Sequence, residues 1–126
     1  MQREASLSRY ANIRGFLDCD WEDFAAIQRI VREVAELHRD RVISDEVLAD
    51  YCAAWVFQPK VLNWVAHAFY GGSIKLVNKS LIFDQLRAIA AELKDVEGVF
   101  YVDDDEGEER LIWTVYEGVV VESRRM

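Results

Sequence analysis

Apolar residues recur at helical spacing in three stretches of this chain, and that periodicity limits the folds it can adopt. Between Trp21 and His38 the stripe occupies positions i, i+3, i+7 and i+10. Because these positions lie on one side of a helix, the stretch predicts an amphipathic helix with one buried face. Similar stripes predict a shorter helix over 45–53, capped by Ser44, and a third over 81–93. The first stripe consists of Phe24, Ile27, Val31 and Val34.

Short segments rich in β-branched and aromatic residues lie between and around these helices. They predict strands over 10–17, 54–57, 61–70, 99–102, 111–116 and 119–122. The segment 61–70 is also compatible with a buried helix, but its aromatic residues and the Gly71-Gly72 pair after it favour a strand. That strand can continue through 74–77, beyond a glycine bend.

The predicted element order is β-α-α-β-β-α-β-β-β. Because the connecting turns are short, we expect an α+β fold. Its expected form is a largely antiparallel sheet of five to six strands, with three helices on one face. The length of 126 residues predicts a single domain over 1–126.

The composition indicates a folded domain that needs no cross-link or metal. Hydrophobic residues make up 52% of the chain, which excludes a disordered or collagen-like protein. Cys19 and Cys52 do not form a C-x-x-C pair, and they are not clustered with His38 or His67. We therefore expect two reduced thiols, no zinc site and no other cofactor.

Neither a secretory signal nor a membrane span is expected. The first 14 residues carry three arginines and no apolar run. No stretch approaches the roughly 20 apolar residues of a spanning helix. The sequence therefore predicts a cytoplasmic protein that does not enter a membrane.

The acidic residues of the chain are concentrated in one segment. The chain has 23 acidic and 15 basic residues, a net charge of −8, and the segment from Glu92 to Glu109 holds nine acids and one base. A smaller base-free group of acids lies between Asp18 and Asp23. Because nucleic acids bind clustered Lys and Arg, we expect no nucleic-acid binding. The charge predicts a basic protein partner instead.

The loop after the predicted strand 99–102 is the main candidate binding site. A calcium site is not expected, because Gly107 occupies a position where an EF-hand loop needs a carboxylate. Two interpretations remain: a solvated loop that keeps the protein soluble, and a docking surface for a basic protein. In the docking case the partner-binding carboxylates are Glu97 and the loop residues Asp103, Asp104, Asp105, Glu106, Glu108 and Glu109.

An exposed aromatic residue would supply the apolar anchor of such a surface. The candidates are Trp55 and Trp64, which flank the turn at Pro59 and could pair across strands, and Tyr116. His67 is expected to be a partly buried strand residue, and a general base beside a carboxylate is the alternative. The chain has no nucleophile elbow, phosphate loop or zinc-protease motif, so we expect no enzyme and no catalytic residues.

Several aromatic runs of the chain carry a family resemblance. They are Ile13-Arg14-Gly15-Phe16 leading to Cys19-Asp20, Trp55-Val56-Phe57-Gln58-Pro59-Lys60, Asn63-Trp64 and Phe69-Tyr70-Gly71-Gly72. From Ile13 to Val121 the chain resembles small bacterial immunity proteins of polymorphic-toxin and contact-dependent-inhibition systems. The resemblance implies a cytosolic bacterial protein that is encoded beside a toxin, binds it tightly and blocks it. Acidic surfaces in such proteins suit toxins with a basic cleft, such as nucleases.

Two other functions fit the same residues. One is an acidic blocker encoded by a phage or plasmid, for instance a nucleic-acid mimic that fills a DNA-binding groove. The other is a small enzyme that uses His67 with a neighbouring carboxylate.

Overall fold

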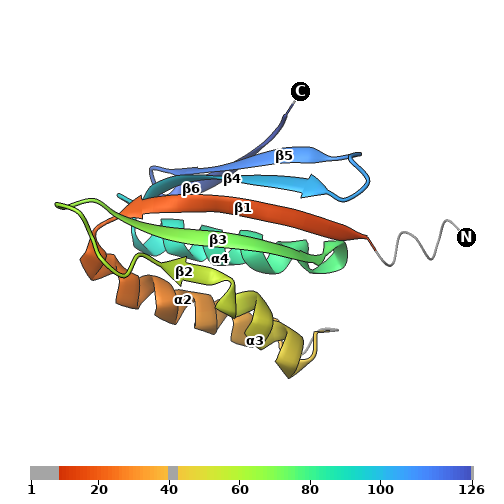
Figure 1. Cartoon of the computed structure of the whole chain (residues 1–126), viewed down its shortest axis with the longest axis horizontal. Coiled ribbons are helices and arrows are strands. Elements are labelled where there is room, and N and C mark those ends of the chain that lie inside the picture. The colour runs from red at the N-terminus through yellow and green to blue at the C-terminus, as the bar shows by residue number, and fades with distance from the viewer. Residues whose placement is uncertain (1–8, 40–42, 126) are drawn as a thin grey trace, which may run out of the picture.

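The computed structural model describes residues 9–39 and 43–125, which form one antiparallel sheet with helices along one of its faces (Figure 1). The strand order is β2-β3-β1-β4-β5-β6. The strands are β1 (Tyr10–Cys19), β2 (Trp55–Phe57), β3 (Ala66–Lys75), β4 (Glu97–Asp104), β5 (Arg110–Tyr116) and β6 (Val119–Arg124). The helices are α2 (Phe24–Leu37), α3 (Asp45–Ala53) and α4 (Lys79–Glu92), with short 3₁₀ turns η1 (Trp21–Asp23) and η2 (Leu76–Asn78).

The predicted fold class is confirmed. Within the described residues the chain has three α-helices, a six-stranded antiparallel sheet and the order β-α-α-β-β-α-β-β-β. The helix over 45–53 has the predicted bounds, and the side chain of Ser44 accepts a hydrogen bond from the backbone N–H of Val47. The first predicted helix begins instead with η1 and becomes α-helical at Phe24.

The predicted strand over 61–70 is wrong in its bounds. Residues 61–65 form a loop, and β3 runs from Ala66 through both glycines to Lys75. The reason is its neighbour: β1 is ten residues long and pairs with β3 along its full length, from Tyr10 opposite Lys75 to Cys19 opposite Ala66. This continuous ladder of backbone hydrogen bonds outweighs the low strand preference of glycine.

Strand β1 lies in the middle of the sheet and divides its side chains between two faces. Ala11, Ile13 and Leu17 are fully buried beneath the helices, whereas Arg14 and Phe16 point to the other face. This alternation is the two-residue period of a strand. We call the second face, away from the helices, the open face.

Two glycines allow β1 and β4 to lie against each other. A Cβ at Gly15 would come within 2.2 Å of the carbonyl oxygen of Val99. A Cβ at Gly98 would come within 2.1 Å of the carbonyl oxygen of Phe16. Because both contacts are with backbone atoms, a side chain at either position requires the strands to move apart.

A buried glutamine ties the second strand to two helices. The indole N–H of Trp55 donates to Oε1 of Gln85 at 3.0 Å, and Nε2 of Gln85 donates to the carbonyl of Val31 at 3.0 Å. Gln85 is completely buried on α4. Because water cannot replace these partners in the core, the side chain fixes how β2, α2 and α4 pack.

We expect the substitution Gln85→Leu to lower the free energy of unfolding by about 1–3 kcal/mol, because the buried indole N–H of Trp55 would lose its acceptor. Urea denaturation measures this change. The control is Gln28→Leu, which alters an exposed glutamine on α2 and should change stability by less than about 0.5 kcal/mol. Equal stability of the two variants would contradict a structural role for the buried amide.

Candidate functional site

The first candidate site, the acidic loop between β4 and β5, is organised around Asp104. Its carboxylate accepts hydrogen bonds from the backbone N–H groups of Glu106, Glu108 and Glu109 at 2.9, 3.0 and 3.2 Å. It also pairs with the guanidinium of Arg9. Asp104 is buried, so the expectation that it contacts a partner is wrong: this carboxylate shapes the loop.

Asp103 faces the opposite way along the strand and is held by two arginines. Its carboxylate lies 3.0 Å from Arg14 and 2.6 Å from Arg125. The guanidinium carbons of both arginines lie over the ring of Tyr101, at 5.5 and 5.2 Å from its centroid. Asp103 therefore belongs to a neutralised cluster on the open face.

Other loop carboxylates also have cations close by. Glu109 lies 3.4 Å from Nζ of Lys79 and 4.0 Å from Arg124. Glu106 and Glu108 lie 3.8 and 3.4 Å from nitrogens of Arg9. Asp105 is exposed and makes no ion pair with any described residue. Much of the charge that the sequence concentrates in this loop is thus balanced within the chain, by cations distant in sequence.

These contacts lower the pKa values of Asp103 and Asp104. Burial opposes ionisation of Asp104, but the N–H groups of Glu108 and Glu106, the charge of Arg9 and the N–H of Glu109 hold its pKa below the ordinary 3.8. Burial likewise opposes ionisation of Asp103. The hydrogen bonds and positive charges of Arg125 and Arg14 outweigh this effect of burial, so the pKa of Asp103 is also lowered. A lowered pKa in the folded state adds stability above pH 3.8 that is lost as the pH falls through the folded value.

We expect Asp104→Ala to lower the free energy of unfolding at neutral pH by about 1–3 kcal/mol, because three loop N–H groups and Arg9 would lose their acceptor. The difference from the original chain should shrink below about pH 4, where that carboxyl becomes protonated. Urea unfolding at a series of pH values measures both effects. Asp105→Ala is the control and should be nearly neutral; a destabilisation by Asp105→Ala equal to that of Asp104→Ala would refute the assignment.

A second group of acids lies at the other end of the sheet, where β1 ends and β4 begins. Asp18 is opposite Glu97 in the β1–β4 ladder. Asp20 and Glu22 follow β1, and Glu117 forms the turn between β5 and β6. We call this the acidic end of the sheet and define it by Asp18, Asp20, Glu22, Glu97 and Glu117. Apart from Asp18, these carboxylates are exposed and make no ion pair with any residue the structure describes.

The thiol of Cys19, at the end of β1, is affected by this concentration of negative charge. Burial raises the pKa of Cys19 to about 12, and the carboxylates of Asp23, Asp20 and Asp18 add to the shift. Both Cys19 and Cys52 are free thiols. Cys19 is therefore protonated and unreactive at neutral pH.

Exposed aromatic residues flank the acidic end. Trp21 in η1 is 61% exposed, and Trp64, in the loop that leads into β3, is 75% exposed. Tyr116 is also exposed at the end of β5. Trp55 is buried in the core and lies opposite Tyr70, so the expectations of an exposed anchor at Trp55 and of a Trp55–Trp64 cross-strand pair are wrong.

The predicted partner-binding residues therefore do not form one surface. Glu97 belongs to the acidic end, and Trp64 and Tyr116 flank it, whereas the loop 103–109 lies at the far end of β4. Seven steps along this strand separate Glu97 from Asp104, or about 23 Å at about 3.3 Å per residue.

The open face carries a row of largely apolar side chains that crosses all six strands. The strand register places Val56 opposite Phe69, Phe69 opposite Phe16, Phe16 opposite Val99, and so on to β6. Phe69 is 42% exposed although it lies in an inner strand. The row consists of Val56, Phe69, Phe16, Val99, Thr114 and Val121.

Neither this row nor the exposure of Trp21 was predicted from the sequence. The available signal was the presence of neighbouring apolar residues, such as Phe16-Leu17 and Phe69-Tyr70, within the strands. Such pairs give a strand an apolar side chain on each face, whereas a sheet with one solvated face alternates apolar with polar.

His67 lies on the open face next to the row. Its Nε2 is 3.0 Å from Oδ1 of Asp18, and its ring stacks on Phe69 and meets Phe16 edge-on. Asp18 is therefore a carboxylate next to His67, as a small enzyme that uses His67 would require. His67 does not line either of the two cavities that the structure describes.

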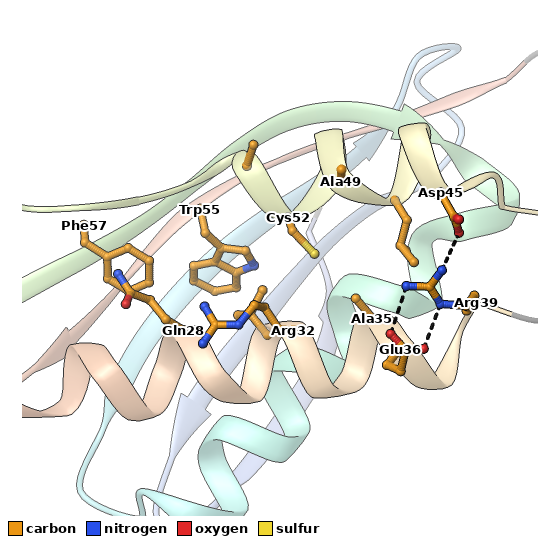
Figure 2. A pocket seen from close by; sticks show the side chains of 13 residues that line it. Gln28, Arg32, Ala35, Glu36, Arg39, Asp45, Ala49, Cys52, Trp55 and Phe57 are labelled. Carbon is orange, nitrogen blue, oxygen red and sulfur yellow. Dashed lines mark hydrogen bonds and ion pairs between the residues drawn. The ribbon is translucent and has the colours of Figure 1, made fainter.

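The first cavity lies between α2 and α3 and has a volume of about 480 Å³ (Figure 2). Val31, Leu48 and Trp55 supply apolar walls. At one end of the cavity the guanidinium of Arg39 is held by Glu36 and Asp45 at 2.7 and 2.8 Å, so this cation is already neutralised. The second cavity, of about 660 Å³, borders α4 and includes the pair His38–Asp84, 3.1 Å apart.

Among residues 9–39 and 43–125 no group of three or more His, Cys, Asp or Glu side chains is placed to hold a metal ion. No described helix is long and apolar enough to span a bilayer. Comparisons with protein-family models, curated proteins and solved structures found no match to this chain.

Proposed function

We propose that this chain is an immunity-type protein that binds a cognate bacterial toxin domain and neutralises it. The observation that carries the proposal is the open face, where side chains from six strands form one largely apolar row. Val56, Phe69 and Val121 of this row are exposed, and its other members are half-buried. Contiguous apolar side chains on a solvent-accessible surface are typical of protein-binding sites. Some residues that carry the family resemblance, Phe16 and Phe69, lie in this row.

The acidic end gives the proposed surface its preference for a basic partner. Asp20, Glu22, Glu97 and Glu117 are exposed and free of internal ion pairs among the described residues, so their field extends into solvent. Trp21, Trp64 and Tyr116 beside them are of the residue types that contribute most at protein interfaces. In this proposal the carboxylates accelerate encounter with the toxin, and the aromatic and apolar residues hold the complex together.

Specific observations favour this function over the nucleic-acid mimic. A mimic presents a dense array of free carboxylates in place of phosphates, but in the densest acidic segment, the loop 103–109, every carboxylate except that of Asp105 lies within ion-pair distance of a cation such as Arg9, Arg14, Lys79 or Arg125. The exposed aromatic residues and the apolar row suit a protein partner better than a DNA-binding groove. A mimic would also be displaced by polyanions, whereas a toxin seated on the apolar row would resist them once bound.

We expect Phe69→Ser to weaken binding of the toxin domain encoded beside this chain by at least about tenfold, mainly through faster dissociation, because the centre of the apolar row is lost. Surface plasmon resonance measures both rate constants. Leu37→Ser is the matched control, since Leu37 is exposed at the end of α2 and is not part of the open face. If both variants bind like the original chain, or if that toxin domain does not bind at all, the proposal fails.

The paired substitution Glu97→Gln and Glu117→Gln should slow association and reduce its dependence on salt, while leaving dissociation nearly unchanged, because these exposed carboxylates act at long range. Stopped-flow association at several ionic strengths tests this. The control pair is Asp45→Asn and Glu46→Gln, which removes the same charge from the start of α3. An equal effect of both pairs would show that only net charge matters and that the acidic end has no special role.

A further inference from the structure

The two edges of the sheet are protected to very different degrees. Edge strand β2 has three residues and is followed by Gln58 and then by Pro59, and Pro59 has no backbone N–H to donate. Edge strand β6 has six residues, begins with three valines and contains neither Pro nor Lys. Natural sheets limit edge-to-edge pairing with short strands, Pro and charged side chains, especially Lys. Strand β2 is protected in this way, whereas β6 is longer, lacks Pro and Lys, and carries one acid and one base, Glu122 and Arg124, which can complement each other across a pairing.

The backbone groups that β6 leaves free can be identified. The N–H of Arg125, just after β6, donates to the carbonyl of Arg110 at 2.7 Å. Because residues alternate along an antiparallel strand, 121 and 123 also direct their backbone groups toward β5. Val120, Glu122 and Arg124 direct theirs outward, where no described strand pairs with them.

The side chains of Glu122 and Arg124 favour one register when the β6 strands of two copies pair with each other. When two β6 strands pair antiparallel about a two-fold axis at Ser123, Glu122 of each copy lies opposite Arg124 of the other. One carboxylate oxygen of Glu122 already accepts the indole N–H of Trp113 at 2.8 Å, which holds the side chain in place and leaves the second oxygen free. Arg124 is exposed, and among the described residues its ion-pair contact is a long one, 4.0 Å to Glu109. Shifting the register to place the axis at Glu122 would bring two like charges together instead.

We propose that two copies of this chain pair through their β6 strands, in antiparallel register, with two reciprocal Glu122–Arg124 ion pairs across the seam. The two sheets then form one continuous sheet of twelve strands. The open faces of both copies lie on the same side of this sheet, and at the seam Val121 of each copy lies opposite Arg125 of the other. This self-association does not depend on the toxin-binding proposal and can be tested on the chain alone.

The test is sedimentation equilibrium of the full chain from low to high micromolar concentration. We expect a reversible monomer–dimer equilibrium. Arg124→Glu should raise the dimer dissociation constant at least about tenfold, because it places like charges opposite one another. Arg32→Glu is the matched control, with the same charge change on an exposed residue of α2, and should dimerise like the original chain.

A mixture of two variants tests the register itself. Arg124→Glu and Glu122→Arg should each be monomeric alone, whereas their equimolar mixture should form a heterodimer in which both opposed pairs are again of opposite charge. Because Glu122→Arg removes the acceptor of the Trp113 indole N–H, thermal unfolding is used to check that this variant folds. If it does not fold, the comparison of the dimer dissociation constants of Arg124→Glu and Arg32→Glu decides whether the proposed pairing is correct. A chain that stays monomeric at all concentrations, or an Arg124→Glu variant that dimerises like its control, would overturn the proposal.

Discussion

The register of β1 at the centre of the sheet is the constraint on which the rest of this structure depends. β1 pairs with β3 at ten positions and with β4 at eight, so most of the sheet is aligned through it. Its inward side chains build the core with the helices, and its outward side chains help to form the open face. A slip of one residue would exchange these two sets. Gly15 and Gly98 oppose such a slip, because each faces a backbone carbonyl at a distance that no side chain could accept.

Electrostatics have separate roles at the two ends of the sheet. At one end, Asp103 and Asp104 are neighbours in sequence but face opposite sides of β4, and arginines from both ends of the chain neutralise them. Those carboxylates contribute to folding. At the other end, Glu97 and Glu117 have no such partner among the described residues and project into solvent. An acidic loop with the greatest density of charge can thus be structural, while a sparser group of acids is the better candidate for binding.

The element types and their order could be predicted because they depend on local pattern. The stripe of α2, the cap at Ser44 and the short turns each specify structure within a few residues. The bounds of β3 could not be predicted, because pairing with β1 rather than local preference carries that strand through Gly71 and Gly72.

The candidate site was predicted less well, for the same reason. Net charge along the sequence shows where acids are dense, but it does not show that Arg9 or Arg125 folds back onto them. Likewise, Trp55 and Trp64 have similar sequence surroundings, and only the tertiary structure buries one beside Gln85 and exposes the other. Which charges and aromatic residues are free for a partner depends on contacts between residues far apart in the chain.

The central claim is that the open face, and not the helical side, receives a protein partner. Hydroxyl-radical footprinting of the complex with the proposed toxin partner tests it most directly, because the reaction reports the solvent exposure of individual side chains. We predict that Phe69 and Tyr101 on the open face become protected, whereas Leu37 and Val47 on the helical side react as in the free chain. Protection of Leu37 and Val47 with unchanged reactivity of Phe69 and Tyr101 would contradict the claim.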